Sequence, residues 1–139
     1  MIKLILADMD GTLLPFGSRV ISERTHQAIL SALDAGIAFG PASGRDYVDL
    51  ADAFDGDARC FSTGIMANGK KVFSDGKLVF KKTLSTEALV KLEGAVRPYA
   101  GTSLWLVADA DETGMRCEQF LCGVEPDDEL ALGVVADSG

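Results

Sequence analysis

The sequence of 139 residues predicts an α/β fold, in which a parallel sheet is followed by the beginning of an α+β module. Residues 3–7 form a continuous hydrophobic run, as expected of a strand in a parallel sheet with both faces covered. Strand and helix patterns then alternate as far as residue 62, which is the signature of right-handed parallel crossovers. Antiparallel pairs are indicated afterwards, so we divide the chain into 1–63, 64–122 and a tail, 123–139.

The elements of the first part follow from their boundary residues. Ser22 is a suitable N-cap for a helix that ends at Gly36. Residues 37–39 are predicted to form the second strand and residues 45–54 the second helix. A third short strand is expected to begin at residues 59–61.

In the second part, Asp75-Gly76 separates two β-rich runs, residues 71–73 and 77–80, and predicts a hairpin. Ser85 is expected to cap a helix that Pro98 stops.

Two further strands are predicted at residues 103–108 and 115–121, joined by a polar turn. The acidic segment 125–130 resembles the start of a helix.

Composition limits the classes of function. The chain is 47% hydrophobic and 24% charged, with a net charge of −8, which argues against a nucleic-acid-binding protein. No segment resembles a signal peptide or is long enough to span a membrane, so we expect a cytoplasmic protein with reduced thiols. The single histidine and the three cysteines show no spacing typical of a metal site and are predicted to be structural: His26, Cys60, Cys117 and Cys122.

The most informative motif is Asp8-Met9-Asp10-Gly11-Thr12-Leu13-Leu14, directly after the first strand. Ligands of open α/β sheets bind beyond the carboxyl ends of the strands, where this motif lies. Residues two apart on extended backbone point the same way, so both carboxylates can face one site. Two neighbouring carboxylates repel each other, which favours a cation or a catalytic role over an ordinary turn.

A second motif, Ala42-Ser43-Gly44-Arg45, follows the second predicted strand. Carboxyl ends of adjacent parallel strands meet, so we expect Ser43 to lie near Asp8. A hydroxyl, a glycine-supported backbone N–H and the start of a helix together form an anion site, to which Arg45 can add a charged contact. The two motifs together predict a phosphate pocket.

With these two motifs and Asn68-Gly69, the sequence resembles the haloacid dehalogenase-like (HAD) superfamily, specifically the Cof-type phosphatases with a class IIB cap. The resemblance implies a Rossmann-like core and a partial α+β cap. It implies a Mg²⁺-dependent phosphomonoester hydrolase that acts on small phosphorylated metabolites through an aspartyl-phosphate.

The resemblance also assigns roles to individual residues. Asp8 is implied as the nucleophile and Asp10 as the general acid and base, and both are implied as Mg²⁺ ligands. The implied phosphate and substrate contacts are Met9, Ser43, Gly44, Arg45 and Asn68.

Two parts of the family pattern are not found: a lysine near the phosphate, and a late acidic motif. The lysines of the predicted cap are expected to face solvent: Lys70, Lys71, Lys77, Lys81, Lys82 and Lys91. A chain of about half the usual length is expected to end inside the cap, with an incomplete core that exposes apolar surface and favours self-association. The alternatives are therefore a truncated family member without turnover, or a phosphomutase relative.

Overall fold

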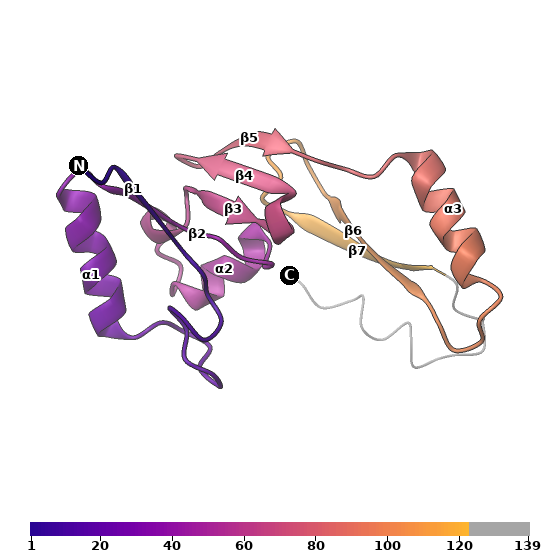
Figure 1. Cartoon of the computed structure of the whole chain (residues 1–139), viewed down its shortest axis with the longest axis horizontal. Coiled ribbons are helices and arrows are strands. Elements are labelled where there is room, and N and C mark those ends of the chain that lie inside the picture. Colours follow the sequence, from indigo (N-terminus) through magenta and orange to yellow (C-terminus); the bar gives the residue numbers. More distant parts are fainter. Residues whose placement is uncertain (123–139) are drawn as a thin grey trace. The chain divides into compact units, whose positions relative to one another are not determined.

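A computed structural model describes residues 1–122 of the chain, which form two compact units (Figure 1). One unit comprises Met1–Lys82 with Thr113–Arg116, and the other contains Thr83–Glu112 and, among the described residues, 117–122. The first unit thus includes the hairpin that the sequence analysis assigned to the cap, and the division at residue 63 stays a prediction. The predicted tail, 123–139, and its helix start at 125–130 lie outside the described residues.

The first unit is built on parallel strands, and its α/β class agrees with the prediction. Strand β1 (Leu4–Ala7) pairs in parallel with β2 (Ala38–Pro41), and helix α1 (Glu23–Asp34) connects them. A parallel bridge between Ala42 and Ile65 continues this arrangement to β3 (Gly64–Met66).

The third strand begins later than the sequence predicts. Residues 59–61 were expected to begin it, but Ala58–Cys60 form a 3₁₀-helix, η1. The physical reason is Asp57, whose side chain accepts a hydrogen bond from the backbone N–H of Arg59 and so caps a helical turn. The strand prediction at these residues was wrong.

An antiparallel hairpin extends the sheet from β3. Strand β4 (Lys71–Ser74) pairs with both β3 and β5 (Lys77–Lys81). The hairpin turn has positive φ at both central residues, 50° at Asp75 and 73° at Gly76. Such a turn matches the twist of the two strands, so the hairpin prediction is confirmed.

The core of the first unit lies around helix α2 (Tyr47–Ala53), which Asp46 caps. Its Leu50 is fully buried, and its Tyr47 ring contacts Phe61 and Phe73 at centroid distances of 5.1 and 4.9 Å. Aromatic packing of this kind holds α2 against η1 and β4.

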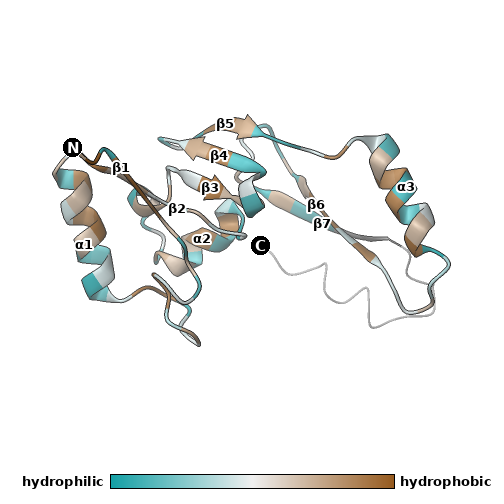
Figure 2. Ribbon diagram, viewed as in Figure 1, coloured by the Kyte–Doolittle hydropathy of each residue, from teal (hydrophilic) through white to brown (hydrophobic). Residues whose placement is uncertain are grey.

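The second unit contains helix α3 (Thr86–Val96) and an antiparallel pair, β6 (Leu104–Asp109) and β7 (Cys117–Cys122). Ser85 caps α3 as predicted. Figure 2 shows that β1 is strongly hydrophobic along its length, whereas α3 mixes polar and apolar residues. None of the helices among residues 1–122 combines the length and apolarity needed to cross a membrane.

Candidate active site

The loop after β1 presents its carboxylates to solvent because its apolar residues anchor it. The side chains of Met9 and Leu14 are buried in the core, and the backbone N–H of Leu14 donates to the Met9 carbonyl at 2.8 Å. Gly11 has a φ of +82°, which lets the chain turn at this point. Asp8 and Asp10 remain exposed on either side of buried Met9. The loop therefore holds two carboxylates at the carboxyl end of a parallel strand.

The loop after β2 is fixed by hydrogen bonds to the segment that follows β3. The Ser43 backbone N–H donates to Ile65 O at 2.9 Å, and the Asn68 N–H donates to Ser43 O at 3.2 Å. Ser43 is itself 9% exposed, and its Oγ accepts a hydrogen bond of 3.1 Å from the Arg45 N–H. The hydrogen bonds with Ile65 and Asn68 thus fix the Ser43 backbone, and the one from the Arg45 N–H orients its hydroxyl.

The two loops meet through a charged contact. The Ala42 N–H donates to Ala7 O at 2.9 Å, which aligns the ends of the two strands. Arg45 Nη2 lies 2.7 Å from Asp10 Oδ1, and Arg45 Nε lies 3.3 Å from Oδ2. The hydrogen bond from Arg45, together with its positive charge, holds the pKa of Asp10 below the ordinary aspartate value. The contact with Arg45 therefore favours the carboxylate form of Asp10.

Asn68 approaches the same loop. Its backbone has a φ of 55°, a conformation that asparagine tolerates better than most residues. A Cβ atom at Gly44 would lie 2.9 Å from Asn68 Oδ1, so glycine at this position is what allows the amide to come close. The structure therefore brings Asn68, Gly44, Ser43, Arg45 and Asp10 together at one sheet edge.

Met9 is placed differently from the other residues assigned to the phosphate. Its side chain is fully buried in the core, so only its backbone can face the site. Its carbonyl accepts from the N–H groups of Thr12 and Leu14.

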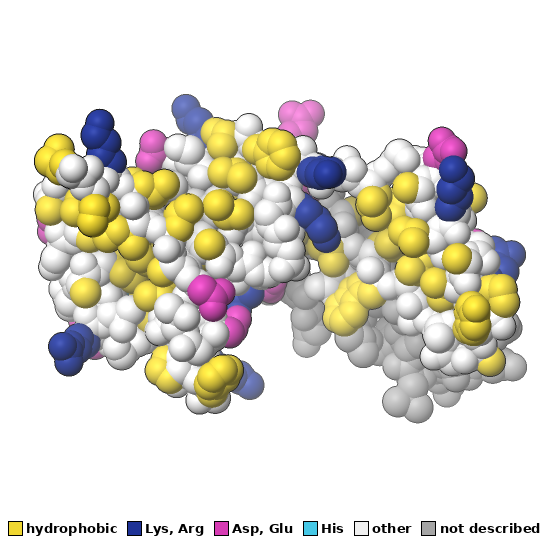
Figure 3. Space-filling view, in the orientation of Figure 1, with side chains coloured by type: hydrophobic (Ala, Val, Ile, Leu, Met, Phe, Trp, Pro, Cys, Tyr) yellow, Lys and Arg dark blue, Asp and Glu magenta, His cyan; other side chains and the backbone are white. Residues whose placement is uncertain are grey.

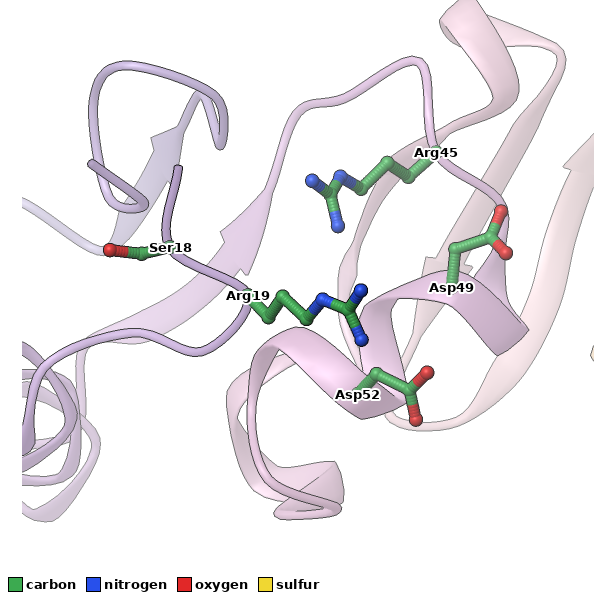
Figure 4. Close-up of a pocket in the computed structure, with 5 residues that line it drawn as sticks. All are labelled: Ser18, Arg19, Arg45, Asp49 and Asp52. Carbon is green, nitrogen blue, oxygen red and sulfur yellow. The ribbon is translucent and has the colours of Figure 1, made fainter. Parts of the chain in front are cut away.

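Beside Arg45 lies a pocket of about 420 Å³ that the sequence analysis did not anticipate. Figure 4 shows Arg19 and Arg45 at this pocket, together with two carboxylates of α2. Its lining residues are Ser18, Arg19, Arg45, Asp49 and Asp52. Asp49 and Asp52 lie three apart, which places them on one face of α2; this spacing was the available signal in the sequence.

One of the lysines expected to face solvent does not. Lys71 is buried, and its Nζ lies 2.8 and 2.9 Å from the two carboxylate oxygens of Asp46 and 3.1 Å from Gly114 O. The first position of β4 faces the core, and the carboxylate that caps α2 compensates the ammonium charge there. The prediction was wrong for Lys71, whereas Lys70, Lys77, Lys81, Lys82 and Lys91 are exposed.

Comparison with known proteins agrees with this architecture. A model of the haloacid dehalogenase-like hydrolase family matches residues 5–115. A protein of Buchnera aphidicola subsp. Schizaphis graminum, named "Putative phosphatase", is 34% identical over 94 residues, which make up 66% of this chain and 33% of that protein.

Solved structures of HAD phosphatases share the fold. BT1666 of Bacteroides thetaiotaomicron, studied among the phosphatases of this superfamily, has a TM-score of 0.67 and 27% identity, covering 97% of this chain and 47% of its own. BT4131, described as a subclass IIB sugar phosphatase, has a TM-score of 0.65 and 23% identity, covering 88% of this chain and 45% of its own. At that identity the second likeness shows the fold alone.

The parallel strands and their crossover helix thus define an α/β protein with the HAD fold. The chain belongs to the haloacid dehalogenase-like hydrolase family. It spans between a third and about half of the length of the relatives described above.

Proposed function

We propose that this chain carries the catalytic loops of a Mg²⁺-dependent phosphomonoester hydrolase that acts on small phosphorylated metabolites in the cytoplasm. The observation that carries the proposal is the contact between Arg45 and Asp10, which joins the two motif-bearing loops at the ends of adjacent parallel strands. Phosphate chemistry in open α/β sheets takes place at such a position.

Asp8 supplies the nucleophile in this mechanism. One of its carboxylate oxygens forms a bond to phosphorus while the bond from phosphorus to the leaving oxygen breaks, and Asp10 donates a proton to that oxygen. Asp10 then removes a proton from water, which attacks the aspartyl-phosphate and releases phosphate, so Asp8 is regenerated. The Ser43 hydroxyl and the nearby Gly44 N–H and Asn68 amide orient the oxygens of the phosphoryl group.

Arg45 connects substrate binding to the protonation of Asp10. Its guanidinium lowers the pKa of Asp10 and so opposes protonation of that carboxylate. A substrate phosphate competes for the same guanidinium because it is also a bidentate acceptor. When Arg45 turns to the phosphate, Asp10 loses the hydrogen bonds that lower its pKa, so protonation of Asp10 costs less free energy than in the ion pair.

The donor atoms of the loop fit magnesium. The exposed Asp8 carboxylate and the main-chain carbonyl of Asp10 are oxygen ligands, which Mg²⁺ prefers, and solvent exposure leaves room for the waters that it retains. When bound, the ion offsets the repulsion between an anionic nucleophile and an anionic phosphate.

The substrate class is suggested by the pocket beside Arg45. Its volume of about 420 Å³ suits a small metabolite, and its lining of two arginines, two aspartates and a serine suits a polar leaving group. Sugar phosphates are one such class, and the structural neighbour BT4131 is described as a sugar phosphatase.

Hydrolysis of an aryl phosphate in the presence of Mg²⁺ tests the proposal. We expect Asp8→Asn to lower kcat by at least about 10³-fold, because the amide is no longer a nucleophile. Asp55→Asn is the matched control: Asp55 is exposed and has a φ of 52°, which asparagine also adopts, so its activity should be unchanged. Equal activity of the Asp8→Asn variant and the wild type would contradict the proposed nucleophile.

A second candidate function is phosphate binding without turnover. The buried ion pair between Lys71 and Asp46 favours this candidate, because a lysine held in that pair does not supply the cation near the phosphate that the family pattern includes. Isothermal titration with inorganic phosphate and Mg²⁺, together with the aryl phosphate assay, separates the two candidates. If the wild type binds phosphate but hydrolyses nothing, and Arg45→Gln weakens that binding, the second candidate is supported and the first is excluded.

A further inference from the structure

Three donor side chains of different chemistry converge away from the Asp8 loop, in the first unit. His26 lies on α1, Asp57 caps η1, and Cys60 is the last residue of η1. One ligand atom from each residue lies within 4.8 Å of the others. His26 Nε2 is 2.8 Å from Asp57 Oδ2.

The backbone explains why these residues meet. The single turn of η1 brings Asp57 and Cys60 together, and the Cys60 N–H donates to Asp57 O at 3.0 Å. His26 reaches that side from the first half of α1. His26 and Asp57 are 31 positions apart in the sequence, and for this reason spacing alone gave no sign of the cluster.

We propose that His26, Asp57 and Cys60 form a binding site for Zn²⁺. Imidazole nitrogen, carboxylate oxygen and thiolate sulfur are the three ligand types that zinc uses, whereas magnesium takes oxygen ligands and does not select a thiol. Three protein ligands leave the fourth tetrahedral position to water.

The three side chains of the cluster differ in how deeply they are buried. The Cys60 side chain is fully buried, while those of His26 and Asp57 are 24% and 17% exposed, so an ion enters from the side of the histidine and the carboxylate. Burial raises the pKa of the free Cys60 thiol to about 11, and zinc binding releases that proton to solvent. The bound ion would replace the hydrogen bond between His26 Nε2 and Asp57 Oδ2.

Arg59 orients the carboxylate ligand. Its Nε lies 2.8 Å from Asp57 Oδ1 and its Nη2 lies 2.6 Å from Oδ2. Partners of this kind hold a metal ligand in the orientation that binding needs. The bound ion would connect α1 to η1, so its expected consequence is a more stable first unit.

The test uses the full chain, treated with EDTA and then titrated with Zn²⁺ or Co²⁺. We expect Zn²⁺ to bind in a 1:1 ratio and to raise Tm, and Co²⁺ to give the thiolate-to-cobalt absorption band in the near ultraviolet. Cys60→Ala and His26→Gln should each weaken zinc binding by at least about tenfold, and Cys60→Ala should abolish the band.

Two controls address other binding sites. Cys117→Ser removes a described cysteine of the second unit, and Asp8→Asn removes a carboxylate of the loop after β1; both should keep the zinc response. The proposal is overturned if wild-type protein binds no zinc, if His26→Gln binds it as tightly as wild type, or if an equal concentration of Mg²⁺ raises the Tm of the Asp8→Asn variant as much as Zn²⁺ does. Should Cys60→Ala fail to fold, the partly exposed His26→Gln decides the matter. No residue is shared with the Asp8–Asp10 site, so this outcome is independent of the phosphatase assay.

Discussion

At the scale of single residues, Arg45 has the largest number of roles. It donates two hydrogen bonds to Asp10, its carbonyl accepts from the Ala67 N–H at 2.8 Å, and it lines the pocket. Its side chain therefore links the carboxylates to the place where a leaving group would lie. An arginine can make such a bidentate contact with either a carboxylate or a phosphate, whereas lysine offers only a point charge.

We predict that Arg45→Gln lowers kcat/KM for an aryl phosphate by roughly 10²-fold, since a charged donor to the phosphoryl group is lost. Arg45→Lys should recover only part of this activity. Arg97→Gln is the matched control, because Arg97 is an exposed arginine of the second unit that pairs with Glu93. Steady-state kinetics of the three variants provide the measurement, and full activity in Arg45→Gln would remove Arg45 from the mechanism.

Gly40 is a residue whose lack of a side chain is essential. A Cβ atom there would lie 2.0 Å from the backbone carbonyl oxygen of Thr63, and backbone at this distance cannot move aside cheaply. We predict that Gly40→Ala lowers the free energy of unfolding by roughly 3 kcal/mol. Gly94→Ala, inside α3 with no atom within 4 Å, should instead stabilise by about 0.5–1 kcal/mol. Urea unfolding of both variants checks the pair, and equal stability of the two would refute the argument.

At the scale of elements, the ion pair between Lys71 and Asp46 joins β4 to the start of α2. Because the side chains are 8% and 12% exposed, loss of one partner leaves a charge that water solvates poorly. We predict that Lys71→Met lowers the free energy of unfolding by about 3–5 kcal/mol. Adding Asp46→Asn should recover part of the loss, since asparagine removes the isolated charge and still caps the helix.

Chemical denaturation of the single and double variants measures this effect. Lys91→Met is the control, as Lys91 forms an exposed pair with Glu87 on α3 and should change stability by less than about 0.5 kcal/mol. If the double variant is less stable than Lys71→Met, the loss of stability in Lys71→Met does not come from the carboxylate charge of Asp46.

The sequence predicts an element well when the contacts that define it join residues close together in the chain. Ser22, Ser85 and Asp75-Gly76 act on their own backbone within a few residues, and the helices and the hairpin that they predict are present. The approach of the two motif-bearing loops could be anticipated because parallel pairing brings the ends of adjacent strands together, whereas the contact between Asp10 and Arg45 was not predicted.

Other features depend on contacts that no local pattern records. Whether a lysine at the start of a strand is buried depends on a carboxylate 25 positions away, as for Lys71 and Asp46. Residues 59–61 were predicted to begin a strand, but the cap at Asp57 makes the segment that contains Cys60 helical. The convergence of His26 with this turn follows from the packing of α1, which periodicity does not specify.

At the scale of the whole chain, the most unusual feature is the exposure of β1. Its pattern is typical of a strand covered on both faces, yet Leu4, Ile5 and Leu6 are 47%, 36% and 40% exposed. Among the described strands, β1 pairs only with β2. Figure 3 shows hydrophobic side chains gathered at the surface of the unit that contains β1. Apolar surface next to an open strand edge favours association with another chain.

We therefore predict that the 139-residue chain self-associates as its concentration rises. The net charge of −8 opposes the approach of two copies, so salt should strengthen the association by screening that repulsion. The double substitution Leu4→Thr/Leu6→Thr removes apolar surface from one face of β1 but keeps β-propensity, and it should shift the protein toward monomer. Val90→Thr on α3, where the side chain is 65% exposed, is the control and should associate like wild type. Sedimentation velocity over a range of protein concentrations measures the shift; a wild type that stays monomeric throughout, or a double variant that associates equally, would show that β1 does not drive the contact.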